Sequence, residues 1–318
     1  MTPLEYYQSY RQLNVTLAEG VCLFGVDVHE YRNAQGFWSP GGSTEAEDFR
    51  VDDAMTHAWP KLQAKVRKYA HGESKGHTRY IVPVGTYAPV PIDASLTGAP
   101  PSIVTDLVDL SELAPVFFGK GKPSQIREVL RLAEMFNLVG DNVPAMNAYC
   151  TKYVGLDCSG FVGNFLQEMG NTSFGPETPA TEFAPMGSRR KSLDDIGALD
   201  VICWKTTNHV AIIDRIVTTS TAISDNRMPS TGRRQSDMED RGGGYQTGRI
   251  ATPFARRVTE VQCMVAESSA AKLLPGDSHT DGLNYTQYTI KSVAGDVFKV
   301  QRGLGGAKIW DVYISKLL

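Results

Sequence analysis

The chain has 318 residues, a formal net charge of −3 and 42% hydrophobic residues, a composition typical of globular proteins with a sizeable core. Because basic residues are not in excess, the composition argues against nucleic acid as a partner. No apolar run is long enough for a membrane span, and the N-terminal residues lack the basic and apolar regions of a signal peptide.

Five cysteines are spread along the chain, and no two of them form a CxxC pair. An odd number without paired spacing fits neither a disulfide framework nor a zinc site. Apart from His209, the histidines show no paired ligand spacing either. We therefore expect no metal and no cofactor.

Residues 1–120 carry no recognisable motif. The sequence predicts a strand over residues 21–28, a helix over residues 52–70 and a strand over residues 79–86. Proline-rich chain follows in residues 88–101, which indicates extended structure or a linker. We expect this N-terminal region to be an accessory or recognition region that packs against the rest or binds the target.

Two helices are predicted in the middle of the chain. Pro123 opens an amphipathic helix, and residues 140–142 end it. A second helix begins at Cys158, with Asp157 as its N-cap and Gly170 as its stop. Its apolar residues recur at helical spacing and predict one buried face: Phe161, Val162, Phe165, Leu166 and Met169.

The C-terminal part has the pattern of an antiparallel sheet. Residues 200–204 and 209–216 are so continuously apolar that we expect them to be central strands. Further strands are predicted over residues 260–268, 288–293, 297–302 and 309–314. Residues 225–250 are polar and glycine-rich, and we expect an insertion or lid there.

Cys158 and His209 are the candidate nucleophile and base. A cysteine in the first turn of a helix is expected to have a lowered pKa, because the helix N-terminus is partly positive and a histidine can pair with the thiolate. His209 begins a strong predicted strand directly after a turn. Packing the Cys158 helix on the sheet would bring the two side chains together, as cysteine hydrolases require.

Three segments resemble, in the same order, the motifs of the NlpC/P60 family of papain-like cysteine peptidases, which are related to CHAP amidases. Residues 157–162, Asp-Cys-Ser-Gly-Phe-Val, are similar to the nucleophile motif. Residues 197–204 resemble the strand that follows a Gly-Asp turn, and residues 208–213, Asn-His-Val-Ala-Ile-Ile, resemble the histidine strand. The resemblance covers roughly residues 123–318.

The resemblance implies an α+β, papain-like fold with a central antiparallel sheet and the nucleophile at a helix N-terminus. It implies a catalytic domain over residues 121–318, with the accessory region over residues 1–120. The third catalytic residue would lie on the strand after the histidine strand. Glu267 is the preferred candidate because a carboxylate both orients and stabilises an imidazolium, and Ser224 or Asp225 is the alternative if residues 222–225 form that strand.

The implied activity is that of a bacterial cysteine peptidase or amidase, a thiol-dependent hydrolase of cell-wall (peptidoglycan) peptides acting outside the cytoplasm. The backbone N–H of Cys158 is the expected oxyanion donor. Tyr149 or Tyr153 would line the substrate cleft, and Asp157 and Ser159 flank the nucleophile as further substrate-binding candidates. Alternative functions are a papain-like deamidase or acyltransferase effector, and a catalytically inactive binding protein on the same fold.

Overall fold

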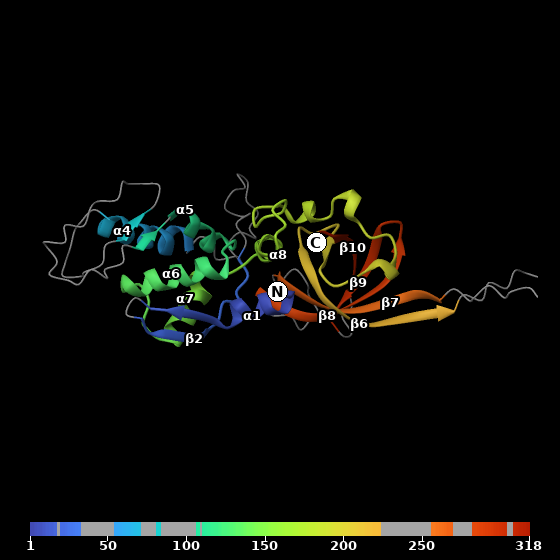
Figure 1. Ribbon diagram of the computed structural model, residues 1–318, viewed down its shortest axis with the longest axis horizontal. Coiled ribbons are helices and arrows are strands. Elements are labelled where there is room, and N and C mark those ends of the chain that lie inside the picture. Colours follow the sequence, from blue (N-terminus) through green and yellow to red (C-terminus); the bar gives the residue numbers. More distant parts are fainter. Residues whose placement is uncertain are drawn as a thin grey trace, which may run out of the picture.

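The computed structural model describes residues 1–17, 20–32, 54–70, 81–83, 106–108, 110–223, 256–269, 282–303 and 308–318. Within these residues, a mainly helical part lies beside a β-barrel, and helix α8 lies between them (Figure 1). Both chain termini lie near this junction in the same view. The predicted insertion at residues 225–250 lies outside the described residues.

The helical part is built from α-helices with two additional short turns. The α-helices are α1 (Pro3–Arg11), α4 (Trp59–Ala70), α5 (Leu110–Leu113), α6 (Pro123–Met135), α7 (Val143–Tyr153) and α8 (Cys158–Glu168). A π-helical turn, Ala54–Ala58, precedes α4, and a 3-10 turn, Ala114–Phe118, follows α5. Two small sheets belong to this part: the antiparallel pair β1 (Leu13–Thr16) and β2 (Cys22–Val26), and the parallel pair β3 (Ile81–Pro83) and β4 (Asp106–Val108).

The remaining strands close into a barrel in the order β10-β5-β6-β7-β8-β9. They are β5 (Asp200–Trp204), β6 (Val210–Ile223), β7 (Arg256–Ser269), β8 (Gly282–Ala294), β9 (Val297–Arg302) and β10 (Ile309–Lys316). Every neighbouring pair is antiparallel. The expected papain-like α+β fold with a central sheet is therefore wrong: β10 pairs with both β5 and β9, so the strands form a closed cylinder.

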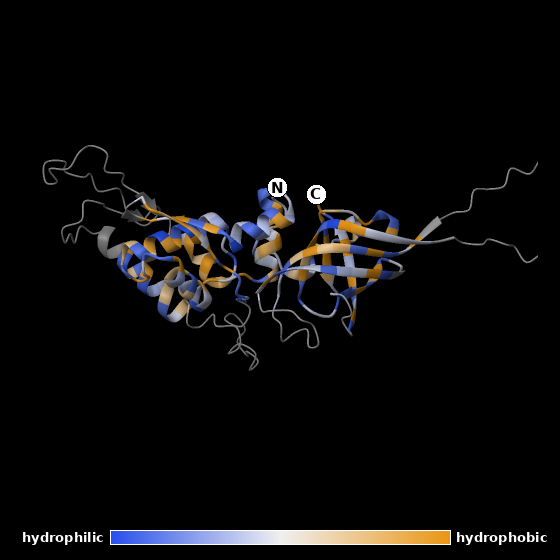
Figure 2. Ribbon diagram, turned by 90° about the horizontal axis from the view of Figure 1, so that it is seen from below, coloured by the Kyte–Doolittle hydropathy of each residue, from blue (hydrophilic) through white to orange (hydrophobic). Residues whose placement is uncertain are grey.

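Alternation along the barrel strands builds two separate cores. Successive side chains of a strand point to opposite faces, and Figure 2 shows hydrophobic and hydrophilic residues alternating along the barrel strands. Ile202, Val265 and Val300 belong to the cluster that fills the barrel. Val201 and Ile212 instead join the core that contains α8, so β5 and the first four residues of β6 are buried on both faces.

Several local predictions agree with the structure. The helix predicted from Pro123 begins there, although it ends at Met135, before residues 140–142. The strands predicted near residues 200–204 and 297–302 are β5 and β9. Strands β6 and β7 form a longer antiparallel pair than predicted, extending to Ile223 and back from Arg256 (Figure 1).

The N-terminal region is joined to the barrel part by packing and by backbone hydrogen bonds. Tyr6 of α1 lies with its ring 5.5 Å from both Phe161 and Phe165 of α8. The peptide N–H of Leu283 on β8 donates to the carbonyl of His29 at 2.7 Å. The described residues within 1–32 therefore share one core with the barrel part.

Candidate active site

The start of α8 fixes the position of Cys158. The Asp157 side chain accepts a hydrogen bond from the peptide N–H of Gly160, as the sequence predicts for an N-cap. Gly160 has no room for a side chain, because a Cβ there would overlap the carbonyl of Gly119. The peptide N–H of Asp157 also donates to that carbonyl at 2.9 Å. The segment before α6 thus packs directly against the nucleophile turn.

A buried ion pair supports the same turn. Lys120 Nζ lies 2.6 Å from Asp157 Oδ2 and donates to Ser159 Oγ at 2.5 Å. Burial raises the pKa of the Asp157 carboxyl, and the neighbouring ammonium of Lys120 opposes that rise. The side chains predicted to contact substrate, Asp157 and Ser159, are therefore held in an internal cluster and are almost fully buried.

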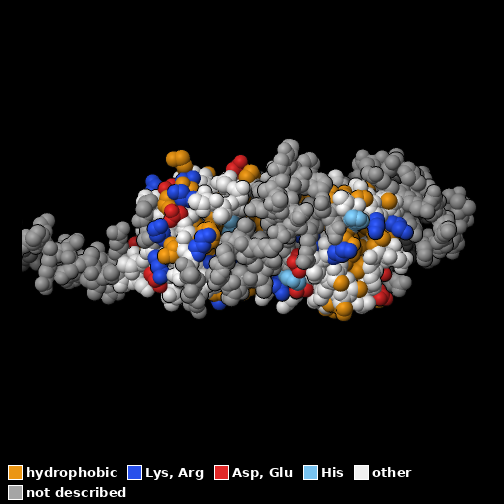
Figure 3. All heavy atoms as spheres, turned by 180° about the vertical axis from the view of Figure 1, so that it is seen from behind, with side chains coloured by type: hydrophobic (Ala, Val, Ile, Leu, Met, Phe, Trp, Pro, Cys, Tyr) orange, Lys and Arg blue, Asp and Glu red, His pale blue; other side chains and the backbone are white. Residues whose placement is uncertain are grey.

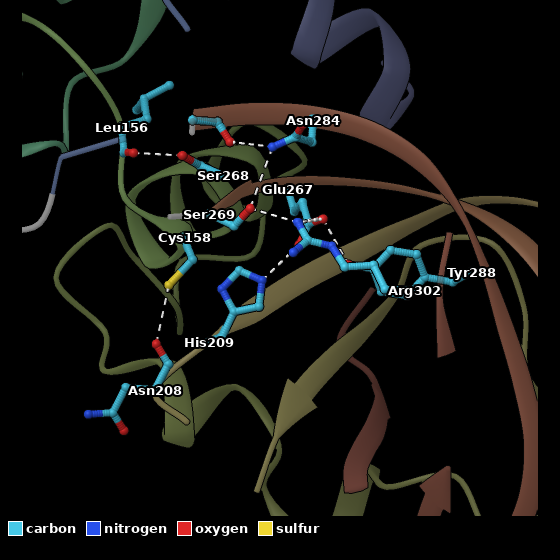
Figure 4. Close-up of polar contacts among 11 residues, drawn as sticks. Leu156, Cys158, Asn208, His209, Glu267, Ser268, Ser269, Asn284, Tyr288 and Arg302 are labelled. Atoms are coloured by element: carbon cyan, nitrogen blue, oxygen red, sulfur yellow. Dashed lines mark hydrogen bonds and ion pairs between the residues drawn. The ribbon is translucent and has the colours of Figure 1, made fainter. Parts of the chain in front are cut away.

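His209 and Glu267 lie together at one end of the barrel. His209 Nε2 is 2.7 Å from Glu267 Oε2, and the Trp204 ring packs edge-on against the imidazole at a centroid distance of 4.5 Å. In Figure 4 the imidazole lies between Cys158 and Glu267, with its other ring nitrogen directed toward the Cys158 sulfur. Cysteine, histidine and carboxylate are thus arranged in the order that a catalytic triad requires.

The tautomer of His209 follows from its partner. An ionised carboxylate only accepts hydrogen bonds, and the Glu267 carboxylate forms an ion pair with Arg302, which remains charged at any ordinary pH. Nε2 of a neutral His209 therefore carries the proton. Nδ1 then presents its lone pair toward Cys158, which is the state of a general base.

The Cys158 thiol differs from the sequence-based expectation. Burial, and next the charge of Asp157, raise its pKa to about 12, although backbone N–H groups of Val210 and Ser159 act in the opposite direction. The thiol donates a hydrogen bond to the carbonyl of Asn208 at 3.6 Å. The expectation of a lowered pKa is wrong for this structure, since loss of hydration outweighs the partial positive charge of the helix terminus.

Tyr31 is a site residue that the sequence analysis missed. Its backbone pairs with Leu156 in an isolated parallel bridge. Burial raises the pKa of Tyr31 well above its usual value, and negative charge on Cys158 and Asp157 and a hydrogen bond to Cys158 raise it further. Tyr31, within residues 1–120, therefore contributes a hydrogen bond to the Cys158 thiol. No sequence motif marks this tyrosine, so only the fold reveals it.

The remaining candidates fall into two groups. Tyr149 and Tyr153 lie on α7, with their rings packed against each other at 5.0 Å, and among the described contacts neither is placed against Cys158. Their role in lining a cleft stays a prediction. Ser224 and Asp225 lie outside the described residues. Glu267 is the only one of the three proposed third residues whose position is described.

Three further observations concern the described residues as a whole. Among them, no group of three or more His, Cys, Asp or Glu side chains is arranged to hold a metal ion. No helix in the described part of the chain is long and apolar enough to cross a membrane. Figure 3 shows basic, acidic and hydrophobic side chains intermixed over the described part of one face.

Comparison of the chain with models of protein families, with characterised proteins and with solved structures found no match.

Proposed function

We propose that this protein is a cysteine hydrolase that cleaves amide bonds with Cys158 as nucleophile, His209 as base and Glu267 as the group that orients the base. The observation that carries the proposal is the His209 imidazole, bonded through Nε2 to Glu267 at 2.7 Å and facing Cys158 with its other nitrogen. Cys158 begins α8, His209 directly precedes β6, and Glu267 lies on β7. Separate elements therefore hold the three side chains in one arrangement.

The resting thiol determines the first step. Because burial keeps Cys158 protonated, His209 removes the proton as the sulfur attacks the amide carbonyl, and Glu267 stabilises the imidazolium that forms. The peptide N–H of Cys158, at the N-terminus of α8, is the proposed donor to the oxyanion. His209 then protonates the leaving amine, and water taken up from solvent hydrolyses the thioester to restore the thiol.

The proposed substrate is a bacterial cell-wall peptide, cleaved outside the cytoplasm. This part of the proposal rests on the resemblance of residues 157–162, 197–204 and 208–213 to NlpC/P60 motifs. It does not rest on a shared fold.

The test is digestion of purified peptidoglycan, with mass analysis of the released peptides and amines. Wild-type protein is expected to release new fragments, whereas Cys158→Ser and His209→Ala are expected to release none. Cys22→Ser is the matched control, because Cys22 is a half-buried free cysteine on β2, outside the site. A glutamine-containing protein is incubated in parallel. Conversion of its glutamine to glutamate, without release of any wall fragment, would indicate a deamidase. Absence of both products, with folded protein, would refute the hydrolase proposal.

A further inference from the structure

Both oxygens of the Glu267 carboxylate are held. Oε2 faces His209, while Oε1 accepts a hydrogen bond from the Tyr288 hydroxyl at 2.8 Å and from Nη2 of Arg302. The same Nη2 donates to Ser269 Oγ at 2.6 Å. Glu267, Tyr288 and Arg302 are each at most 1% exposed, and Figure 4 shows them grouped on the side of His209 away from Cys158.

The barrel brings these side chains together from three neighbouring strands. Glu267 lies on β7, Tyr288 on β8 and Arg302 on β9, and Tyr288 is directly opposite Arg302 in the β8–β9 register. Along β9, Phe298 and Val300 fill the barrel interior, and Arg302 follows them at the same two-residue period. Arg302 is therefore an inward-facing charge at the end of an apolar row.

A buried carboxylate stays ionised only when a partner compensates its lost hydration. We propose that Arg302 is a positioning residue of this site, which keeps Glu267 ionised and holds its Oε2 toward His209. This inference rests on the proposed function, because it assigns a role within the same triad. Among the described contacts, Arg302 bonds Glu267 and Ser269, so it acts on the reaction through Glu267.

Among the described residues, the other titratable groups around the triad do not replace this partner. Tyr288 is buried, which raises its pKa well above the usual value, so it donates a hydrogen bond but supplies no positive charge. Lys120 is paired with Asp157 at the start of α8. Tyr31 and Cys158, on the other side of the imidazole, supply no positive charge either.

Loss of the guanidinium therefore has a defined consequence. In Arg302→Met the buried Glu267 carboxyl is expected to take up a proton near neutral pH, because burial disfavours its charge. A protonated carboxyl no longer stabilises the imidazolium, so the thiol is deprotonated more slowly. The alkylation rate of the variant relative to the wild type is expected to recover as the pH is raised and Glu267 ionises. A merely structural role of Arg302 would not produce this recovery.

The experiment measures the rate of Cys158 alkylation by iodoacetamide against pH, by peptide mass analysis, with Cys22 in the same chain as an internal reference. At neutral pH, Arg302→Met is expected to slow alkylation of Cys158 as much as Glu267→Gln does, on the order of 10²-fold. The double variant is expected to be no slower than Glu267→Gln alone. Arg302→Lys retains the positive charge and is expected to slow alkylation of Cys158 less than Arg302→Met does.

Two controls keep the result interpretable. Arg190→Lys alters another arginine–carboxylate pair, in which Arg190 is bonded to Asp200 at two distances of 2.9 Å. Asp200 lies at the opposite end of β5 from Trp204, the residue that packs on His209, so this variant should leave the rate unchanged. If Arg302→Met does not fold, Arg302→Lys takes its place in the cycle with Glu267→Gln. The smaller loss of alkylation rate caused by Arg302→Lys must then vanish when Glu267 is already replaced by glutamine.

Two results would overturn the role of Arg302. One is that the Arg302 and Glu267 substitutions slow alkylation of Cys158 by factors that multiply independently. The other is that Arg302→Met is alkylated at the wild-type rate at every pH. Amide hydrolysis could still be intact in that case. Conversely, coupled alkylation effects with no amide cleaved from any substrate would refute the proposed function and leave the role of Arg302 standing. The two failures are therefore distinguishable.

Discussion

Replacing Lys120 by methionine tests whether the turn that carries Cys158 depends on its buried ion pair. The side chains of Lys120 and Asp157 expose 8% and 5% of their surfaces, and the charged atoms are 2.6 Å apart. At that separation two unit charges attract by roughly 6 kcal/mol at an effective dielectric constant of about 20. Removing one partner of a buried pair typically costs about 3–5 kcal/mol.

We expect Lys120→Met to lower the free energy of unfolding by about 3 kcal/mol, near the lower end of that range. Gly160 and Ser159 still donate hydrogen bonds to the remaining carboxylate. Because the pKa of Asp157 is raised in the folded protein, the folded state binds this proton more tightly than the unfolded state. Stability contributed by this group is therefore present at low pH and falls as the pH rises from the unfolded pKa through the folded one.

Without the Lys120 ammonium, the pKa of Asp157 in the folded protein rises further, so this loss of stability continues to higher pH. The difference in free energy of unfolding between variant and wild type should therefore be larger at about pH 8 than at about pH 5. Urea unfolding followed by tryptophan fluorescence measures both values. Lys122→Met, two residues further along and only half-buried, is the matched control. A loss below about 1 kcal/mol, as for an exposed pair, or one that does not change with pH, would refute the reasoning.

Two further predictions concern the same turn. Tyr31→Phe removes a hydrogen bond to the Cys158 sulfur, and because such a bond stabilises a thiolate, alkylation of Cys158 should slow by about tenfold; an unchanged rate would contradict a role for the hydroxyl. Gly160→Ala places a Cβ against the Gly119 carbonyl and should lower the free energy of unfolding by about 1–3 kcal/mol. Gly187→Ala, where a Cβ meets nothing within 4 Å, should be nearly neutral in the same denaturant titration.

The sequence predicted the elements whose signals are local. The Asp157 cap, the helix that starts at Cys158 and the strand at residues 297–302 follow from side-chain chemistry and apolar spacing over a few residues. The expectation of one buried face is wrong for α8, because every residue from Cys158 to Leu166 is buried. Helices α1 and α7 were missed, although both carry readable signals: Thr2 and Glu5 form a capping box, and Asn142 caps α7.

Barrel closure could not be predicted in the same way. The apolar pattern shows which faces of a strand are buried, but it does not show that β10 pairs with β5 more than a hundred residues earlier in the chain. The surroundings of the site depend on such distant contacts. In the sequence, Arg302 is only the last residue of a predicted strand, and nothing pairs it with Glu267. Glu267 itself is a candidate only through the motif resemblance.

Residues 29–32 have a consequence for engineering this protein. Leu156, two residues before the nucleophile, donates its N–H to Glu30 and accepts from the N–H of Arg32, while Leu283 of β8 donates to His29. This short stretch of backbone thus connects the loop that precedes Cys158 to the barrel. Transplanting the C-terminal two-thirds alone would remove Tyr31 from beside Cys158, so any exchange of parts should carry the first 32 residues along.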